Sequence, residues 1–449
     1  MMTAQPLFAM SEAEFSQLKQ AVEQLKKKQD EDTRRINELE WQLKQAEAGA
    51  KQPVRSAGNG LEKSASVDPF APTGFAGGTS AAQGSRSAHA PQAGNSFNPA
   101  MGVTLMGTLG NFSRNPEAAT VPGFALADES GSAGTQGFSL GESEISLSAN
   151  IDHRLYGQLT MSLDGGGAAE VEEAFIQTTS LPMGLTAKGG RFFSGIGYLN
   201  EQHLHAWDFL DAPLPYRAML NGQLGDDGVQ IRWTVPTSTF LQIGVEGFRG
   251  EGFPATPGHN GLGAASLFVK TGGDIDASNS WLGSLAYYHT DADALSVSNG
   301  ADLFSGATDM GIAGMVWKWA PDGNGAERQF KWQSEFLLRR QDGLFNGLDY
   351  RGNQYGYYGQ ALYQFMPQWS VGVRYDQVAA GDVSSPLAGT ALDTQGHTPH
   401  RSSAILMYDT SEFGRFRLQY NQDDASPSSN REILLNYTVS FGAHGAHAY

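Results

Sequence analysis

The chain has 449 residues, no cysteine, 56 glycines and a formal net charge of −17, and only 17% of its residues are charged. Soluble globular chains usually carry about a quarter charged residues, so this composition favours many strands and turns. The lack of cysteine excludes disulfides and thiolate metal sites, and the acidic balance argues against a nucleic-acid partner. No apolar run reaches the roughly 18 residues of a transmembrane helix.

Residues 11–47 have the pattern of one amphipathic helix. Mostly apolar positions recur at steps of three and four, while lysine, glutamate, glutamine and arginine fill most of the others. The recurring positions are Phe15, Leu18, Val22, Leu25, Gln29, Asp32, Ile36, Leu39, Leu43 and Ala46. This heptad seam predicts a parallel coiled coil that oligomerises the chain, with the polar pair in its middle fixing the register. A lone helix packed on another domain is the alternative.

Residues 48–98 consist mainly of alanine, glycine, serine, proline and glutamine, with few large apolar side chains. Such a segment cannot bury enough apolar surface to fold, so we predict a disordered linker. About fifty flexible residues span about 40 Å on average, which separates the predicted helix from the C-terminal part of the chain.

Apolar and polar residues alternate from residue 101 onwards. Val371, Val373 and Tyr375, for example, are separated by Gly372 and Arg374. A period of two predicts strands with one apolar face. We predict sixteen strands, at residues 102–113, 138–151, 154–163, 169–179, 184–192, 227–235, 238–248, 262–271, 280–290, 310–319, 327–340, 353–365, 369–378, 401–410, 415–422 and 431–449.

The predicted connections alternate in length. Those on one side are mostly long, namely 114–137, 193–226, 249–261, 291–309, 341–352 and 379–400, although 164–168 and 423–430 are short. Those on the other side are short turns. This asymmetry is typical of a membrane barrel with external loops and periplasmic turns. The sequence therefore predicts an all-β antiparallel transmembrane barrel of about 16 strands over residues 101–449. A soluble β-rich protein with buried apolar faces is the alternative.

Aromatic residues near predicted strand ends support the membrane barrel, because such barrels carry interfacial aromatic girdles. Any one of them could equally belong to an ordinary core. The residues are Trp281, Tyr287, Tyr288, Trp317, Trp319, Tyr357, Tyr358 and Trp369.

Two stretches, residues 140–152 and 190–194, look like barrel segments of Gram-negative porins that have an N-terminal coiled coil. The chain resembles the dicarboxylate-porin (DcaP-like) and phosphate-selective porin O/P groups, and like porin-type barrels it ends on an aromatic residue, Tyr449. The resemblance implies a homotrimer in the lipid and lipopolysaccharide of the bacterial outer membrane, with the helix in the periplasm and small polar solutes diffusing through. The loops lack the lysines that we associate with phosphate selectivity.

By the same resemblance, connection 193–226 folds into the barrel and narrows its lumen; an outward-facing loop is the alternative. Strand parity adds polar-face residues on the opposite wall. The predicted constriction and pore-lining residues are Arg191, His203, His205, Asp208, Asp211, Arg217, Arg232, Lys331, Arg339, Arg374, Arg415 and Arg417.

The charges in this set suggest a transverse field across the lumen. The acidic side consists of Glu142, Glu144, Glu170, Glu172 and Glu173. Clustered arginines bind carboxylates and phosphates bidentately, so we expect a preference for small anions or dicarboxylates. The alternative is that these charges only pair with each other.

No motif predicts an enzyme or a cofactor, since phosphate-binding, nucleophile-elbow, zinc-protease and dinucleotide patterns are all absent. His203 and His205 are two residues apart and could form half of a metal site, but no third ligand is evident, so no metal is predicted. The same holds for His444 and His447. An energy-coupled receptor needs a plug and roughly 22 strands, more than this length allows. A non-transporting barrel that anchors the envelope through its coiled coil is the remaining alternative.

Overall fold

The computed structural model describes residues 99–116, 120–127, 134–163 and 169–442. The predicted coiled coil at 11–47, the linker at 48–98, the connection 164–168 and the chain end with His444, His447 and Tyr449 lie outside these residues. None of the helices in the described ranges is long and apolar enough to cross a membrane.

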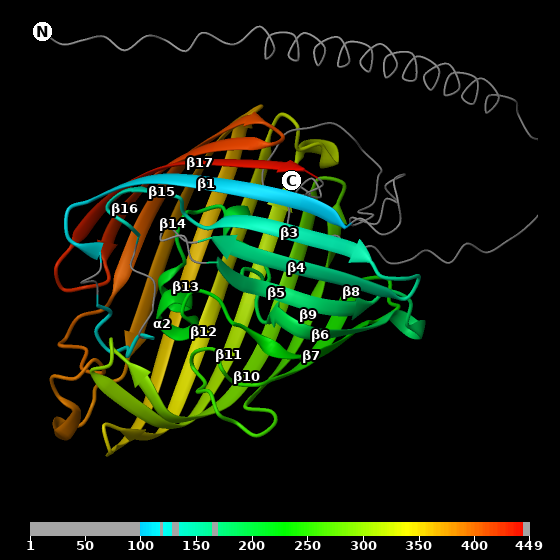
Figure 1. Cartoon of the computed structure of the whole chain (residues 1–449). Helices are drawn as coiled ribbons and strands as arrows, with labels where there is room; N and C mark the ends of the chain where they lie inside the picture. The colour runs from blue at the N-terminus through cyan, green and yellow to red at the C-terminus, as the bar shows by residue number, and fades with distance from the viewer. Residues whose placement is uncertain (1–98, 117–119, 128–133, 164–168, 443–449) are drawn as a thin grey trace, which may run out of the picture. The chain divides into compact units, whose positions relative to one another are not determined.

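One antiparallel sheet contains all the strands of the described ranges, and it closes on itself because β1 pairs with β17 (Figure 1). The strands are β1(Ala100–Phe112), β2(Gly137–Ser139), β3(Ser143–Asn150), β4(Leu155–Leu163), β5(Ala169–Thr178), β6(Leu185–Phe193), β7(Gly225–Thr234), β8(Phe240–Phe248), β9(Ala264–Asp276), β10(Asn279–Val297), β11(Asp302–Trp319), β12(Gln329–Phe345), β13(Leu348–Met366), β14(Trp369–Ala380), β15(His400–Ser411), β16(Gly414–Asp424) and β17(Asn430–Gly442).

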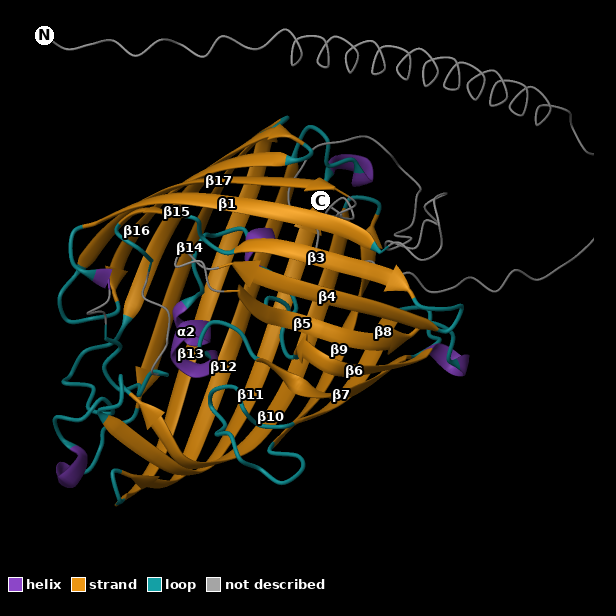
Figure 2. Ribbon diagram, in the orientation of Figure 1, coloured by secondary structure: helices purple, strands orange, loops and turns teal. Residues whose placement is uncertain are grey.

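Strands β2 and β3 both pair with β1, one beside each half of it, so together they act as a single strand of the barrel. Counting them as one leaves sixteen, which confirms the predicted barrel. The helical segments are short and lie between strands (Figure 2). They are η2(Pro182–Gly184), η3(Leu204–Ala206), α2(Leu214–Leu220), η4(Pro321–Gly323) and η5(Ser385–Leu387).

The barrel is apolar outside and polar inside. On β14, Val371, Val373 and Tyr375 point outward and are 40%, 60% and 39% exposed. The inward-facing Arg374 and Asp376 on the same strand are buried. This is the reverse of a soluble protein, and it suits a barrel whose outer face meets lipid while every backbone group is paired within the sheet.

Aromatic side chains gather on the outer face near the rim with the short turns. Trp281, Trp317 and Trp332 occupy paired positions on β10, β11 and β12. Two residues predicted for the girdle belong elsewhere, because strand parity turns Tyr288 and Tyr358 into the lumen, where both are buried.

Two of the predicted long loops are wrong. Strand β10 continues to Val297 and β11 begins at Asp302, so only a short turn joins them. Strands β12 and β13 likewise meet in a tight turn after Phe345. Segments 291–309 and 341–352 were predicted to be loops because they are polar and rich in glycine. The pairing continues because inward-facing Phe304 and Phe345 there pack against Leu387 and Leu392 of the connection after β14.

Candidate functional site

The chain turns into the barrel after β6 and does not return to the wall until β7. We call residues 194–224 the inner loop; it includes α2, which lies within the ring of strands in Figure 1. The Asn200 side chain closes its base. The Asn200 amide donates to the carbonyl oxygens of Ser194 and Leu224, both at 2.9 Å, and its oxygen accepts from the Leu224 amide at 2.8 Å.

An apolar core packs α2 against the barrel wall. Leu214, Met219 and Leu220 of the inner loop are completely buried. They belong to one cluster with inward-facing apolar residues of the wall, including Leu337 and Val378. Lumenal positions of a barrel are usually polar, so these wall residues mark where the loop packs.

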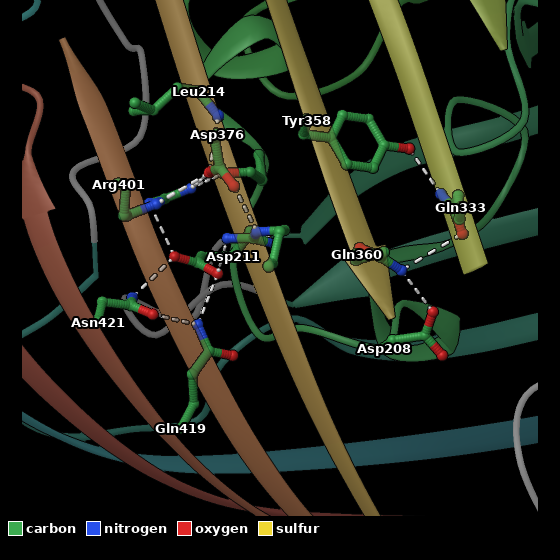
Figure 3. Close-up of polar contacts among 12 residues, drawn as sticks. Asp208, Asp211, Leu214, Gln333, Tyr358, Gln360, Asp376, Arg401, Gln419 and Asn421 are labelled. Carbon is green, nitrogen blue, oxygen red and sulfur yellow. Dashed lines mark hydrogen bonds and ion pairs between the residues drawn. The ribbon is translucent and has the colours of Figure 1, made fainter. Parts of the chain in front are cut away.

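A row of cationic side chains on β12, β14, β15 and β16 faces the inner loop. We call it the basic wall; its members are Lys331, Arg339, Arg374, Arg401, Arg415 and Arg417. Asp211 of the loop is its central partner (Figure 3), bonding Arg374 at 2.7 Å and Arg401 at 2.8 Å. Burial alone would raise the pKa of Asp211, but the two guanidiniums lower it to about 2.

Other contacts attach the loop along the same wall. Lys331 pairs with Asp208 at 2.5 Å, and Gln360 donates to the same carboxylate at 2.7 Å (Figure 3). Arg417 donates to the Trp207 carbonyl at 2.8 Å. Asp208 therefore neutralises Lys331 within the protein, whereas Arg417 is buried against the loop and bound to neutral oxygens.

Two further carboxylates complete the attachment. Glu201 of the loop pairs with Arg232 of β7 and Lys270 of β9; burial acts to raise its pKa, but these cations lower it to about 2. On β12, the buried Glu335 accepts hydrogen bonds from the Tyr198 amide at 2.7 Å and the Tyr216 hydroxyl at 2.8 Å.

Glutamates of β3 and β5 face the opposite side of the loop. We call Glu144, Glu172 and Glu173 the acidic wall. His203 reaches Glu172 with Nδ1 and Glu173 with Nε2, each at 3.0 Å, and His205 Nδ1 lies 2.9 Å from Glu144. Burial disfavours charge on His203, but the glutamates raise its pKa well above the ordinary value.

A cavity of about 630 Å³ opens beside the loop on this side. The charged groups that the described residues contribute to its lining are six carboxylates and two guanidiniums, from Glu142, Glu170, Glu172, Asp211, Asp226, Glu251, Arg191 and Arg217. Arg217 is buried, and its Nε and Nη1 have no hydrogen-bond partner among the described residues. It also lines a second cavity of about 510 Å³ formed with the loops of the rim.

The barrel wall is incomplete at the edge of the larger cavity. Strand β6 pairs with β5 only from Lys188 to Arg191, because the chain then turns inward. Arg191 follows the outward parity of this strand and pairs with Asp227 of β7 at 2.7 Å. Parity turns Arg191 away from the barrel interior, so it lines the cavity only at this gap in the wall and not on an ordinary lumenal face of a strand.

No protein-family model matches the chain. An uncharacterized protein of Aquifex aeolicus (strain VF5) is 30% identical over 346 residues, which cover 70% of this chain and 70% of that protein. The chain belongs to the family of this Aquifex protein.

Solved structures similar to the chain are outer-membrane proteins. One is the outer membrane channel DcaP of Acinetobacter baumannii, with a TM-score of 0.52 and 10% identity over 76% of this chain and 97% of that chain. Another is the anion-selective porin from Comamonas acidovorans, with a TM-score of 0.50 and 10% identity over 76% of this chain and 99% of that chain. At such identities the likeness concerns the fold. The chain has the porin-type barrel fold, as its resemblance to Gram-negative porins predicted.

The structure brings eleven of the twelve predicted residues to the lumen. His203, His205, Asp208, Asp211 and Arg217 lie in the inner loop. The remaining lumenal members are Arg232, Lys331, Arg339, Arg374, Arg415 and Arg417, of which Arg415 pairs with Asp409 of the wall at 2.5 Å.

Sequence reasoning missed several residues that the site uses. Arg401 begins a predicted strand on its polar face, so parity could have identified it. No third metal-ligating group was evident beside His203 and His205, yet the fold brings Glu144 and Glu172 to them, because the barrel closes around the loop.

Proposed function

We propose that the chain forms a channel in the bacterial outer membrane through which small polar solutes diffuse. The observation that carries this proposal is the charged cavity of about 630 Å³ beside the inner loop, inside a barrel with an apolar outer face. The porin-type fold supports the same function. Lipid and lipopolysaccharide would then surround the apolar band, and the long loops would face outward.

The charges of the cavity favour cations over anions. The expected preference for anions or dicarboxylates depends on free arginines, but Arg374, Arg401 and Arg417 are buried against the inner loop. Among the described residues that line the cavity, five carboxylates besides the arginine-paired Asp211 stand against two guanidiniums. Arg217, with two unbonded nitrogens, is the lining group best suited to bind a carboxylate.

Reversal potentials across planar bilayers under a salt gradient test this selectivity. We expect cation selectivity that weakens in Glu170→Gln, because Glu170 is an exposed lining residue without a salt bridge among those of the described chain. Asp349→Asn removes an exposed carboxylate outside the cavity lining and serves as the matched control. Anion selectivity that disappears in Arg217→Gln would instead support the anion preference.

A non-transporting structural barrel is the second candidate, favoured by the apolar core that α2 forms with the barrel wall. The bilayer experiment separates the two functions, since an anchor would give no steady conductance. We further propose that the chain is a homotrimer held by a periplasmic coiled coil at 11–47. Mass measurement in detergent tests this assembly, because removal of residues 11–47 should then weaken the trimer.

A further inference from the structure

His203 and the acidic wall form a cluster of metal-ligating groups. His203 Nδ1 is 3.0 Å from Glu172 Oε2 and 3.4 Å from Glu144 Oε2. One ligand atom from each of these three residues lies within 4.8 Å of the other two. Ligand atoms around a tetrahedral zinc ion stand roughly 3.3–3.5 Å apart, given bonds of about 2.0–2.2 Å. Small side-chain rotations would therefore bring the three donors to a common ion.

The second nitrogen of the imidazole has a partner that suits metal binding. His203 Nε2 lies 3.0 Å from Glu173 Oε2. A histidine that ligates a metal usually donates its other N–H to a carboxylate or carbonyl, which orients the ring and leaves the ligating nitrogen unprotonated. Glu173 can fill this role, so that Nδ1 directs its lone pair toward Glu144 and Glu172 once a metal ion has displaced its proton. The His205 ring stacks on His203 at a centroid distance of 5.8 Å and limits its rotation.

The charge of the cluster calls for a cation. The side chains of Glu144, Glu172 and Glu173 are only 6%, 10% and 10% exposed. In the described part of the chain, the salt bridges of these glutamates involve the two histidines and no lysine or arginine. Carboxylates this close repel each other in a poorly solvated site. A divalent ion that takes the place of the proton on His203 would neutralise them more fully.

The cluster is open to the lumen, because Glu172 and Leu204 line the cavity of about 630 Å³. Calcium and magnesium prefer all-oxygen sites, whereas an imidazole with carboxylates suits zinc and similar first-row ions. We propose that His203, Glu144 and Glu172 bind a divalent transition-metal ion of the Zn²⁺ class. This proposal deepens the cation preference of the lumen proposed above, but does not require that the barrel conducts.

Titration of the full-length barrel in detergent with Co²⁺, followed by visible absorption, tests the site. We expect one Co²⁺ per chain to be lost in His203→Gln and in Glu172→Gln, and to be displaced by Zn²⁺ but not by excess Mg²⁺. Glu173→Gln should weaken the affinity about 10–100-fold if this residue orients the imidazole. His153→Gln, in an exposed turn, is the matched control and should bind as the unmodified chain does.

Two results overturn the proposal: absence of bound Co²⁺ in the unmodified chain, or equal binding by His203→Gln. Circular dichroism of each variant identifies those that fail to form the barrel, and Glu144→Gln provides a further ligand variant if one does. A barrel that conducts without binding Co²⁺ contradicts the metal site alone. One that binds Co²⁺ without conducting contradicts the channel alone.

Discussion

The basic wall and the acidic wall hold opposite sides of the same inner loop with opposite arrangements of charge. On β12–β16 the wall supplies lysine and arginine, and the loop supplies carboxylates and carbonyls such as Asp211 and the Trp207 oxygen. On β3 and β5 the wall supplies carboxylates, and the loop supplies His203 and His205. Guanidinium groups remain charged at every physiological pH, whereas imidazole groups gain or lose charge with their surroundings.

This difference indicates separate roles for the two sides. The basic wall fixes the position of the loop, because its bonds are numerous, buried and permanently charged. The acidic wall keeps a partly open, negatively charged space in which a cation can be exchanged. Arg217 is the single lysine or arginine of the inner loop. Cleavage by trypsin after this residue therefore measures how often the loop opens.

The largest effect should follow from removing the central partner of the basic wall. Asp211→Ala leaves Arg374 and Arg401 short of a buried counter-charge, which costs about 3–5 kcal/mol. We expect tryptic cleavage after Arg217 to be about a hundredfold faster or more, together with a higher single-channel conductance. Asp349→Ala removes an exposed aspartate and is the control. Equal cleavage rates in the two variants would mean that the basic wall does not fix the loop.

A smaller effect is expected at Glu335, where the carboxylate accepts from Tyr198, Tyr216 and Tyr358. Glu335→Gln keeps the shape but replaces one acceptor oxygen with an amide donor, leaving a buried group poorly satisfied at about 1–3 kcal/mol. Cleavage after Arg217 should become about 5–150-fold faster. An unchanged cleavage rate would mean that Glu335 does not help to hold the inner loop on the barrel wall.

A substitution on the acidic side of the loop should speed tryptic cleavage less than one on the basic side. His205→Gln retains a donor toward Glu144, so the expected cost is at most about 1.5 kcal/mol, or about tenfold in cleavage rate. An effect as large as that of Asp211→Ala would contradict the difference drawn between the walls.

Mild acid should have the smallest effect on the loop. The pKa of Asp211 is lowered in the folded protein to about 2, so its contribution is complete above the ordinary pKa of an aspartate, about 3.9, and is lost as the pH falls toward 2. Glu201 behaves in the same way. Tryptophan fluorescence should therefore show no change attributable to these contacts between pH 7 and 5, and a change below about pH 4. Control spectra of Asp211→Asn should lack part of the acid change.

The strands could be predicted because each one alternates over its own length, as β14 does. The strand ends within 291–309 and 341–352 could not be predicted, because their pairing depends on packing against residues in the connection after β14. The contacts of the inner loop were beyond local patterns for the same reason. Asp211 meets Arg374, 163 positions along the chain, only after the barrel closes. Parity identified the polar face of most strands, but it could not assign partners to Glu144 or Glu172.

The Asn200 side chain holds the two ends of the inner loop together, so much of the loop between them can vary in sequence. It joins the two ends of the loop, Ser194 and Leu224, through its own three hydrogen bonds, so one side chain near the start of the loop brings the ends together. Evolution or a designer could therefore replace the residues that line the cavity while β6 and β7 keep their pairing. Lumen chemistry could then diverge quickly among relatives whose walls stay almost the same.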